Sequence, residues 1–193
     1  MANIGLSKPY YAIYTCSSGT VTYSNGGSAG KAVSASIEVE GESDNNLYAD
    51  NGIAESAGGF ANGTLTLGID ELRLNVAKAL LGLNEVTEGT GSSQVTAYSF
   101  RAGQVAPYVG VGMITKKQIE NQWKWLAVFL PKCQFEVPSD TYETQGETIT
   151  FNTPELNAKV LRDDTANAEW KRFASFDSEE SAESYIKGLL DIT

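Results

Sequence analysis

Residues 107–131 read PYVGVGMITKKQIENQWKWLAVFLP. Both ends of this stretch are rich in β-branched and aromatic residues, and a polar segment at 116–122 separates them. The pattern predicts two antiparallel strands, at 107–115 and 123–131, joined by a turn. In the second strand both faces are apolar, with Trp123, Trp125, Ala127 and Phe129 on one and Leu126, Val128 and Leu130 on the other. We therefore expect that strand to be buried on both sides, in the core of the fold.

Further strands are predicted on either side of this hairpin. A second hairpin is predicted at 10–16 and 20–23, and the glycines within 26–30 are expected to end it. Alternation over 32–40 predicts a strand with Val33, Ala35, Ile37 and Val39 facing the core and Ser34, Ser36, Glu38 and Glu40 facing water. The remaining predicted strands are 64–69, 132–137, 148–151, 156–161 and 170–176.

Two helices complete the prediction. Asp70 is the expected N-cap of the first, whose apolar residues recur at helical spacing up to Gly82, the expected end. The second is predicted over 177–190, with Asp177 as N-cap and Glu180 at capping-box spacing. The polar segment 84–94 is expected to return across the surface as a loop. The fold class is thus mainly β with flanking helices (α+β), in one domain spanning residues 1–193.

Composition narrows the function. The formal net charge is -10, which opposes binding to DNA or to an anionic membrane, because such binding needs clustered Lys and Arg. No apolar run is long enough to span a bilayer, so we expect a soluble protein made in the cytoplasm, with no membrane partner. In that compartment Cys16 and Cys133 are expected to be two buried thiols without a disulfide.

Motifs for catalysis are weak. The chain has no histidine, so the usual general base and the commonest metal ligand are both missing. Residues 26–30 match G-x-S-x-G, but they lack the flanking strand, helix and base of a nucleophile elbow. The cluster Asp44, Asn45, Asn46 and Asp50 could coordinate calcium, yet Tyr48 stands where an EF-hand loop carries Asp or Asn. We expect no enzyme activity, no catalytic residue, no bound metal and no cofactor.

A long acidic segment, residues 41–62, connects the predicted strands at 32–40 and 64–69. Between Lys31 and Arg73 the chain carries eight carboxylates and no Lys or Arg. Apolar side chains punctuate the same region, at Leu47, Tyr48, Ile53 and Phe60. We expect an extended loop without secondary structure of its own, and so long a loop in a compact domain is usually functional or disordered. Its composition favours contact with a protein.

Six segments carry a family resemblance. In chain order they are NIGLSKPYYA at 3–12, NNLYADNGIAE at 45–55, GTLTLGIDEL at 63–72, APYVGVG at 106–112, LPKCQF at 130–135 and GETITFNTPEL at 146–156. Their ordered combination, which covers nearly the whole chain, resembles the phi13-type major tail tube proteins of long-tailed phages that infect Gram-positive bacteria. Such proteins are found in virions and in integrated prophages.

The resemblance implies a tail-tube-type β-sandwich or barrel with a packed helix and a long extended loop. It also implies a structural protein of the virion tail, six copies of which form a ring, with rings stacked into a hollow tube for DNA ejection. Partners would be further copies of the chain and other tail proteins such as the tape measure and the terminator, while genome DNA passes without specific binding.

The resemblance also suggests roles for particular residues. The loop would contact a neighbouring subunit through Asn46, Leu47, Tyr48, Asp50, Asn51, Ile53 and Phe60. The outer face of the strand at 32–40 would line the lumen through Ser34, Ser36, Glu38 and Glu40. Carboxylates in that position would repel phosphate and let the genome slide.

Two alternatives remain open. A tail terminator or another tube-fold tail component would use the same fold to cap a tube instead of extending it. A β-sandwich carbohydrate-binding module would use Trp123 or Tyr48 as a stacking platform, which requires an exposed aromatic ring.

Overall fold

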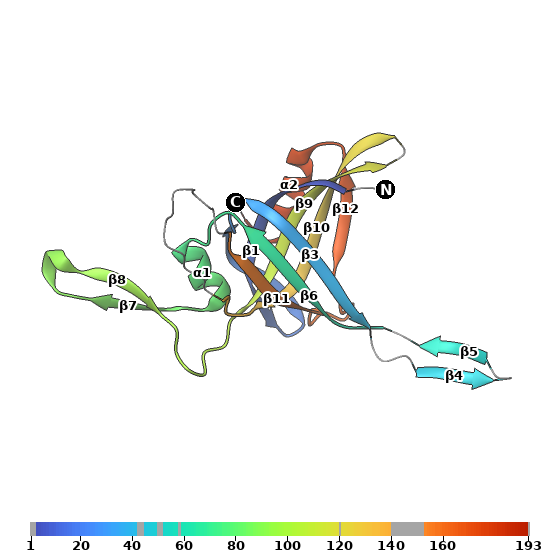
Figure 1. Cartoon of the computed structure of the whole chain (residues 1–193), viewed down its shortest axis with the longest axis horizontal. Helices are drawn as coiled ribbons and strands as arrows, with labels where there is room; N and C mark the ends of the chain where they lie inside the picture. Colours follow the sequence, from blue (N-terminus) through green and yellow to red (C-terminus); the bar gives the residue numbers. More distant parts are fainter. Residues whose placement is uncertain are drawn as a thin grey trace, which may run out of the picture.

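The structure, a computed structural model, describes residues 3–41, 45–49, 52–57, 59–119, 121–139 and 153–192. Over these residues the fold is mainly β with two α-helices, as the sequence predicts (Figure 1). The first half of the chain forms β1 (Asn3–Ser17), β2 (Thr20–Ser28), β3 (Ala32–Gly41), β4 (Asn45–Ala49), β5 (Gly52–Ala57), β6 (Phe60–Ile69) and α1 (Leu74–Leu81). The second half forms β7 (Asn84–Glu88), β8 (Val95–Ser99), β9 (Tyr108–Ile119), β10 (Gln122–Phe135), β11 (Glu155–Leu161), β12 (Arg172–Phe176) and α2 (Glu179–Leu189).

One antiparallel sheet organises the body, in the strand order β2-β1-β9-β10-β11-β6-β3. The central strand β10 has two neighbours on the side away from β9. Its residues Trp125–Phe129 pair with β12, and its residues Lys132–Phe135 pair with β11. The register with β9 shifts between Leu130 and Cys133, at Pro131, which has no N–H for the ladder. The sheet therefore divides at this irregularity.

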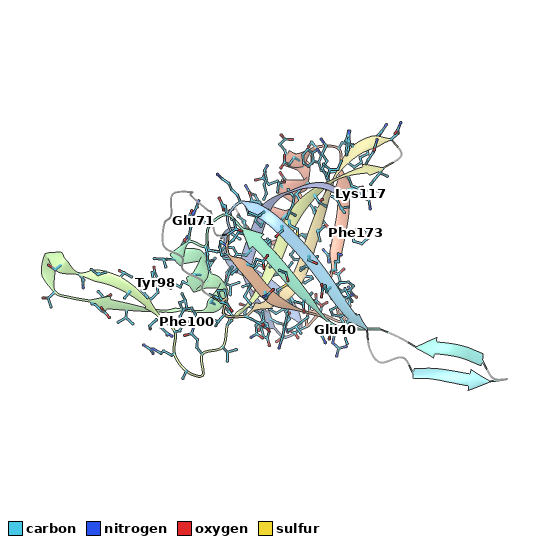
Figure 2. The ribbon with its side chains drawn as sticks, in the orientation of Figure 1. Glu40, Glu71, Tyr98, Phe100, Lys117 and Phe173 are labelled. Carbon is cyan, nitrogen blue, oxygen red and sulfur yellow. The ribbon has the colours of Figure 1, made fainter. Side chains whose placement is uncertain are left out.

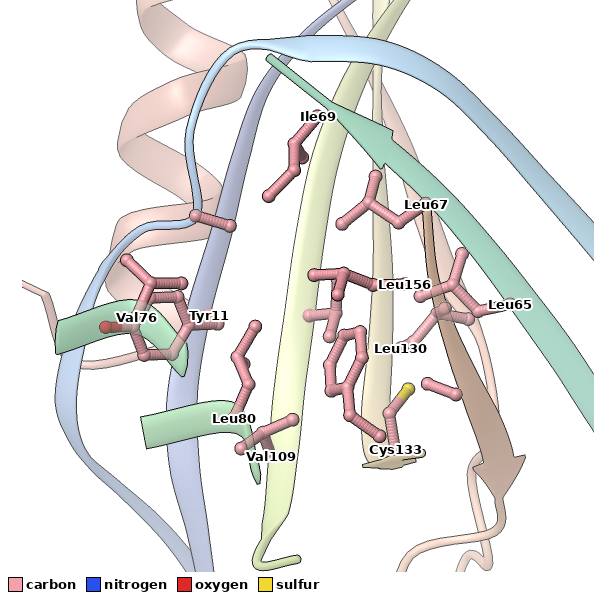
Figure 3. Packing of buried hydrophobic residues seen from close by; sticks show 14 of the residues in the cluster. Tyr11, Leu65, Leu67, Ile69, Val76, Leu80, Val109, Leu130, Cys133 and Leu156 are labelled. Carbon is pink, nitrogen blue, oxygen red and sulfur yellow. The ribbon is translucent and has the colours of Figure 1, made fainter. Parts of the chain in front are cut away.

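The main core lies where the sheet curls over itself. Figure 3 shows Leu65 and Leu67 of β6 and Leu156 of β11 pointing into the same interior as Leu130 of β10. Val76 and Leu80 of α1 belong to the same cluster and close one end of it. These side chains are almost completely buried, and their burial is the main force holding the body together.

A second, smaller core lies on the opposite face of β9 and β10, under α2. Ala127 and Phe129 of β10 pack there against Ala182, Ile186 and Leu190. The prediction that the second strand of the central hairpin is buried on both faces is therefore confirmed from Ala127 to Leu130. It is wrong for Trp123, which is 46% exposed, because it lies beside the turn of the hairpin and belongs to neither cluster.

The helix boundaries differ from the prediction. Helix α1 begins at Leu74, and its N-cap is Arg73 instead of Asp70. The Asp70 carboxylate instead accepts a hydrogen bond of 2.7 Å from the Lys31 N–H, which ties the end of β6 to the turn before β3. Gly82, with a φ of 70°, ends the helix as predicted. Helix α2 is capped by the Ser178 hydroxyl, one residue after the predicted Asp177.

Two predicted loops contain strands. The segment 41–62 includes β4 and β5, which pair as a hairpin, and the segment 84–94 begins with β7, which pairs with β8. Figure 1 shows both hairpins extending away from the body. The prediction of loops was wrong because a hairpin that leaves the body has no core face, and so its sequence lacks the apolar alternation that marks a buried strand.

Smaller corrections concern strand ends and the cysteines. Strand β2 continues through the glycines to Ser28, with a register shift against β1 between Tyr11 and Ile13. Cys133 is buried, but Cys16 is only partly so. The predicted strand at 148–151 lies outside the described residues.

Candidate assembly surfaces

The outer side of β3, β6 and β11 is a polar face. The register places Ser36 beside Thr66 and Thr66 beside Asn157. The Thr66 hydroxyl donates a hydrogen bond of 2.9 Å to the Asn157 side-chain oxygen. Further exposed members of this polar face are Ser34, Glu38, Glu40, Thr64, Glu155 and Lys159. With three carboxylates and one lysine, the face is acidic.

The four residues proposed for a lumen therefore lie together. Ser34, Ser36, Glu38 and Glu40 are all exposed on β3 and share the polar face. The expectation that they face water is confirmed.

Strand β3 is also an open edge. Among the described residues it pairs only with β6, so the N–H and C=O groups along its other side have no strand partner. Val33 is 55% exposed and Val39 is 49% exposed, while Ala35 and Ile37 are half-buried. The prediction that all four face the core is wrong for Val33 and Val39, because the layer beneath β3 does not extend under the whole strand.

A groove opens between β3 and β12. Its volume is about 780 Å³, and its apolar lining includes Val33 and Ile37 of β3, Met113 of β9, Val128 of β10 and Phe173 of β12. Phe173 is 67% exposed. Lys117 and Lys171 also line it. Figure 2 shows Lys117 and Phe173 on the same side of the body.

The β4–β5 hairpin carries most of the residues proposed for a subunit contact. Asn46, Leu47 and Tyr48 lie on β4 and Ile53 on β5, where Tyr48 is paired with Ile53. Asp50 and Asn51 lie outside the described residues.

Phe60 is separate from this group. It begins β6 and stacks on Trp170 within the same chain, with ring centroids 4.3 Å apart.

The β7–β8 hairpin adds a surface that the sequence did not reveal. Near its base Phe100, Val105 and Val137 are exposed and line a recess of about 420 Å³. These residues come from segments more than thirty positions apart. No local pattern could have brought them together, although the run VTAYSF at 95–100 could have signalled β8.

A cluster of polar side chains around Lys132 connects β10 with β1 and β9. The Lys132 ammonium binds the Asp164 carboxylate at 2.7 Å and lies over the ring of Tyr108, 4.6 Å from its centroid. Hydrogen bonds from Lys132 and from the Tyr14 hydroxyl lower the pKa of Asp164. A carboxylate held charged in this way is no general acid near neutral pH. No group of three His, Cys, Asp or Glu side chains suited to a metal ion occurs within the described part of the chain.

No family model matches the chain, and no curated protein matches it. Neither helix of the described residues has the length and hydropathy to cross a bilayer.

Proposed function

We propose that this chain is a structural subunit that joins its own copies, and that it is the major tail tube protein of a long-tailed phage. The observation that carries the proposal is β3, an edge strand that pairs only with β6 among the described residues, contributes to the polar face, and is followed in the chain by a projecting hairpin. Natural proteins usually shield such an edge, because it can pair with another chain. An open edge beside an exposed apolar groove suits a protein whose function is assembly.

A ring needs a head-to-tail contact between copies, and the open edge of the sheet offers one side of such a contact. Strand β3 is one end and β2 is the other. Pairing of the β3 edge with a different surface of the next copy is a head-to-tail contact, which generates a ring when the rotation closes. The family resemblance supplies the number six. The backbone hydrogen bonds of such a contact would satisfy the free groups of β3.

Stacking and transport would use the remaining surfaces. The β4–β5 and β7–β8 hairpins extend beyond the body (Figure 1) and could reach copies in the same or the next ring. The polar face would line the lumen. Its carboxylates repel phosphate, and its serine and threonine hydroxyls offer no fixed positive charge to hold DNA.

The sugar-binding alternative has one observation in its favour, the exposure of Trp123. However, the Lys116 ammonium lies over that ring, 5.1 Å from its centroid. A cation above the indole already occupies one face, which weakens the ring as a stacking platform.

Electron microscopy over a concentration series tests the proposal. The wild-type chain is expected to be monomeric when dilute and to form long tubes when concentrated. Val39→Lys puts a charge beside the β3 edge and should raise the concentration needed for tubes about tenfold. Ser184→Lys adds the same charge to the exposed side of α2 and should have no effect.

Three outcomes would contradict the tube assignment. A chain that stays monomeric at every concentration rules out self-assembly. Fixed rings that never stack support a terminator instead. A tryptophan fluorescence change on adding sugars, abolished by Trp123→Ala, supports a carbohydrate module.

A further inference from the structure

We propose that the groove between β3 and β12 is the docking site for the β4–β5 hairpin of a second copy of this chain. The inference rests on the proposed assembly and names the two surfaces that meet. The groove provides an apolar floor in Met113, Leu126 and Val128, flanked by the exposed side chains of Val33 and Phe173. Filling it with apolar groups would remove these side chains from water.

Charge identifies the occupant. Lys117 and Lys171 are the charged residues that line the groove, and neither forms an ion pair with any residue that the structure describes. In a chain of net charge -10, a groove lined by two lysines favours an acidic ligand.

The β4–β5 hairpin has the matching sequence. Residues 45–57 include two carboxylates, Asp50 and Glu55, and no Lys or Arg. The same stretch of sequence also supplies apolar groups, at Leu47, Tyr48 and Ile53. A segment that combines both kinds of side chain can fill the apolar floor and place carboxylates near the two lysines.

The direction of the hairpin indicates that the contact is between copies. Strand β3 lines the groove from Val33 to Ile37 and ends at Gly41, and β4 follows it in the chain. Figure 1 shows β4 and β5 extending away from the body at the end of β3. Figure 2 labels Glu40 at that end and shows Lys117, a residue that lines the groove, at the opposite end of the body. The hairpin of one chain is thus directed away from its own groove.

Charge reversal in the full-length chain tests the pairing. Lys117→Glu with Lys171→Glu should raise the concentration for assembly at least tenfold at low salt, and Asp50→Lys with Glu55→Lys should do the same. A chain that carries all four substitutions should assemble within threefold of wild type, because the attraction is restored with opposite sign. If the groove variant assembles as the wild type does, the docking is overturned. It is also overturned if the chain with all four substitutions is folded, as judged by circular dichroism, but does not recover assembly.

A cross-link separates this proposal from the tube itself. One full-length chain carries Phe173→Cys and another carries Tyr48→Cys, both with Cys16→Ser. Mixed and oxidised, the two are expected to form disulfide-linked heterodimers in excess over a control pair in which Ser184→Cys, on the exposed side of α2, replaces Phe173→Cys. Heterodimers without tubes would support the docking while refuting the tube. Tubes without excess heterodimers would overturn the docking alone.

Discussion

The rings of Phe60 and Trp170 stack face to face, with centroids 4.3 Å apart and planes 2° from parallel. Phe60 is the first residue of β6, just after the β4–β5 hairpin, and Trp170 precedes β12. The stack therefore ties the first residue of β6 to the segment that leads into β12, the strand that forms one wall of the groove.

Phe60→Leu should reduce the free energy of unfolding by roughly 1 kcal/mol, since it keeps an apolar side chain and removes the stack. Urea denaturation followed by tryptophan fluorescence measures the change. Phe100→Leu is the control, because Phe100 is exposed and takes part in none of the aromatic pairs found among the described residues. Equal losses for the two variants would contradict a specific role for the stack.

Gly112 allows α2 to approach the sheet. A Cβ built at this position would lie 2.3 Å from Cγ2 of Ile186. Gly112→Ala should therefore destabilise the fold by about 2 kcal/mol, because the buried Ile186 has no free space into which to move. Gly188→Ala, on α2 itself, would meet nothing within 4 Å. It should be neutral or stabilising by up to about 1 kcal/mol, because alanine favours the helix. Thermal unfolding compares the two, and the same sign for both would refute this account of the packing.

Glu183 connects α2 to β1 by charge. Its carboxylate accepts hydrogen bonds from Lys8 and, at 2.6 Å, from the Tyr10 hydroxyl, and it lies 3.0 Å from the Lys187 ammonium. The bond from Lys8, followed by that from Tyr10, lowers the pKa of Glu183 from 4.5 to about 2. Because the folded-state pKa is the lower one, the stabilisation is complete above pH of about 4.5 and is lost as the pH falls toward about 2.

Glu183→Gln should therefore cost roughly 2 kcal/mol at pH 7, a value discounted for the partial exposure of the side chain. The difference from wild type should shrink as the pH falls from about 4.5 to about 2. Urea titrations at several pH values measure this dependence. Glu180→Gln, on the exposed side of the same helix, should show little change. A wild-type-to-variant difference that is constant with pH would refute the assignment.

The proposed lumen makes a functional prediction. Glu38→Lys with Glu40→Lys should still permit tubes but slow DNA ejection severalfold, because lysines on the polar face would hold phosphate. Phage particles carrying the variant allow ejection to be timed, and added salt should weaken the effect. Glu71→Lys with Glu180→Lys makes the same change in net charge at exposed sites before α1 and on α2, and should leave ejection unchanged. Normal ejection by the first variant would exclude the lumen assignment.

The central hairpin could be predicted because its signal is local. Val128 and Phe129 are consecutive, apolar and buried on opposite faces. Because successive side chains of a strand point to opposite faces, the sequence alone assigns each of them to its face. The pairing of β10 with β9 could also be predicted, because only a short turn connects the two strands. The same reasoning anticipated α2 and the end of α1 at Gly82, since capping and helical spacing also depend on neighbours in sequence.

The projecting hairpins and the groove could not be predicted in this way. Val33 and Val39 have the alternation of core residues, yet the structure exposes both, because burial depends on whether another layer lies above a strand. Lys117 and Lys171 are far apart in sequence and meet only because β9 and β12 flank opposite sides of β10.

By itself, the sequence determined the mainly β fold, the burial of β10 on both faces from Ala127 to Leu130, the water-facing row on β3 and the acidic character of the segment that follows. Each of these depends on which residues are neighbours along the chain. Only the tertiary structure decided that β3 is an open edge, that segment 41–62 forms a projecting hairpin, and that a lysine-lined groove separates β3 from β12. These features depend on strands that meet across long distances in sequence, and the free energy of burial that selects such pairings belongs to the whole fold.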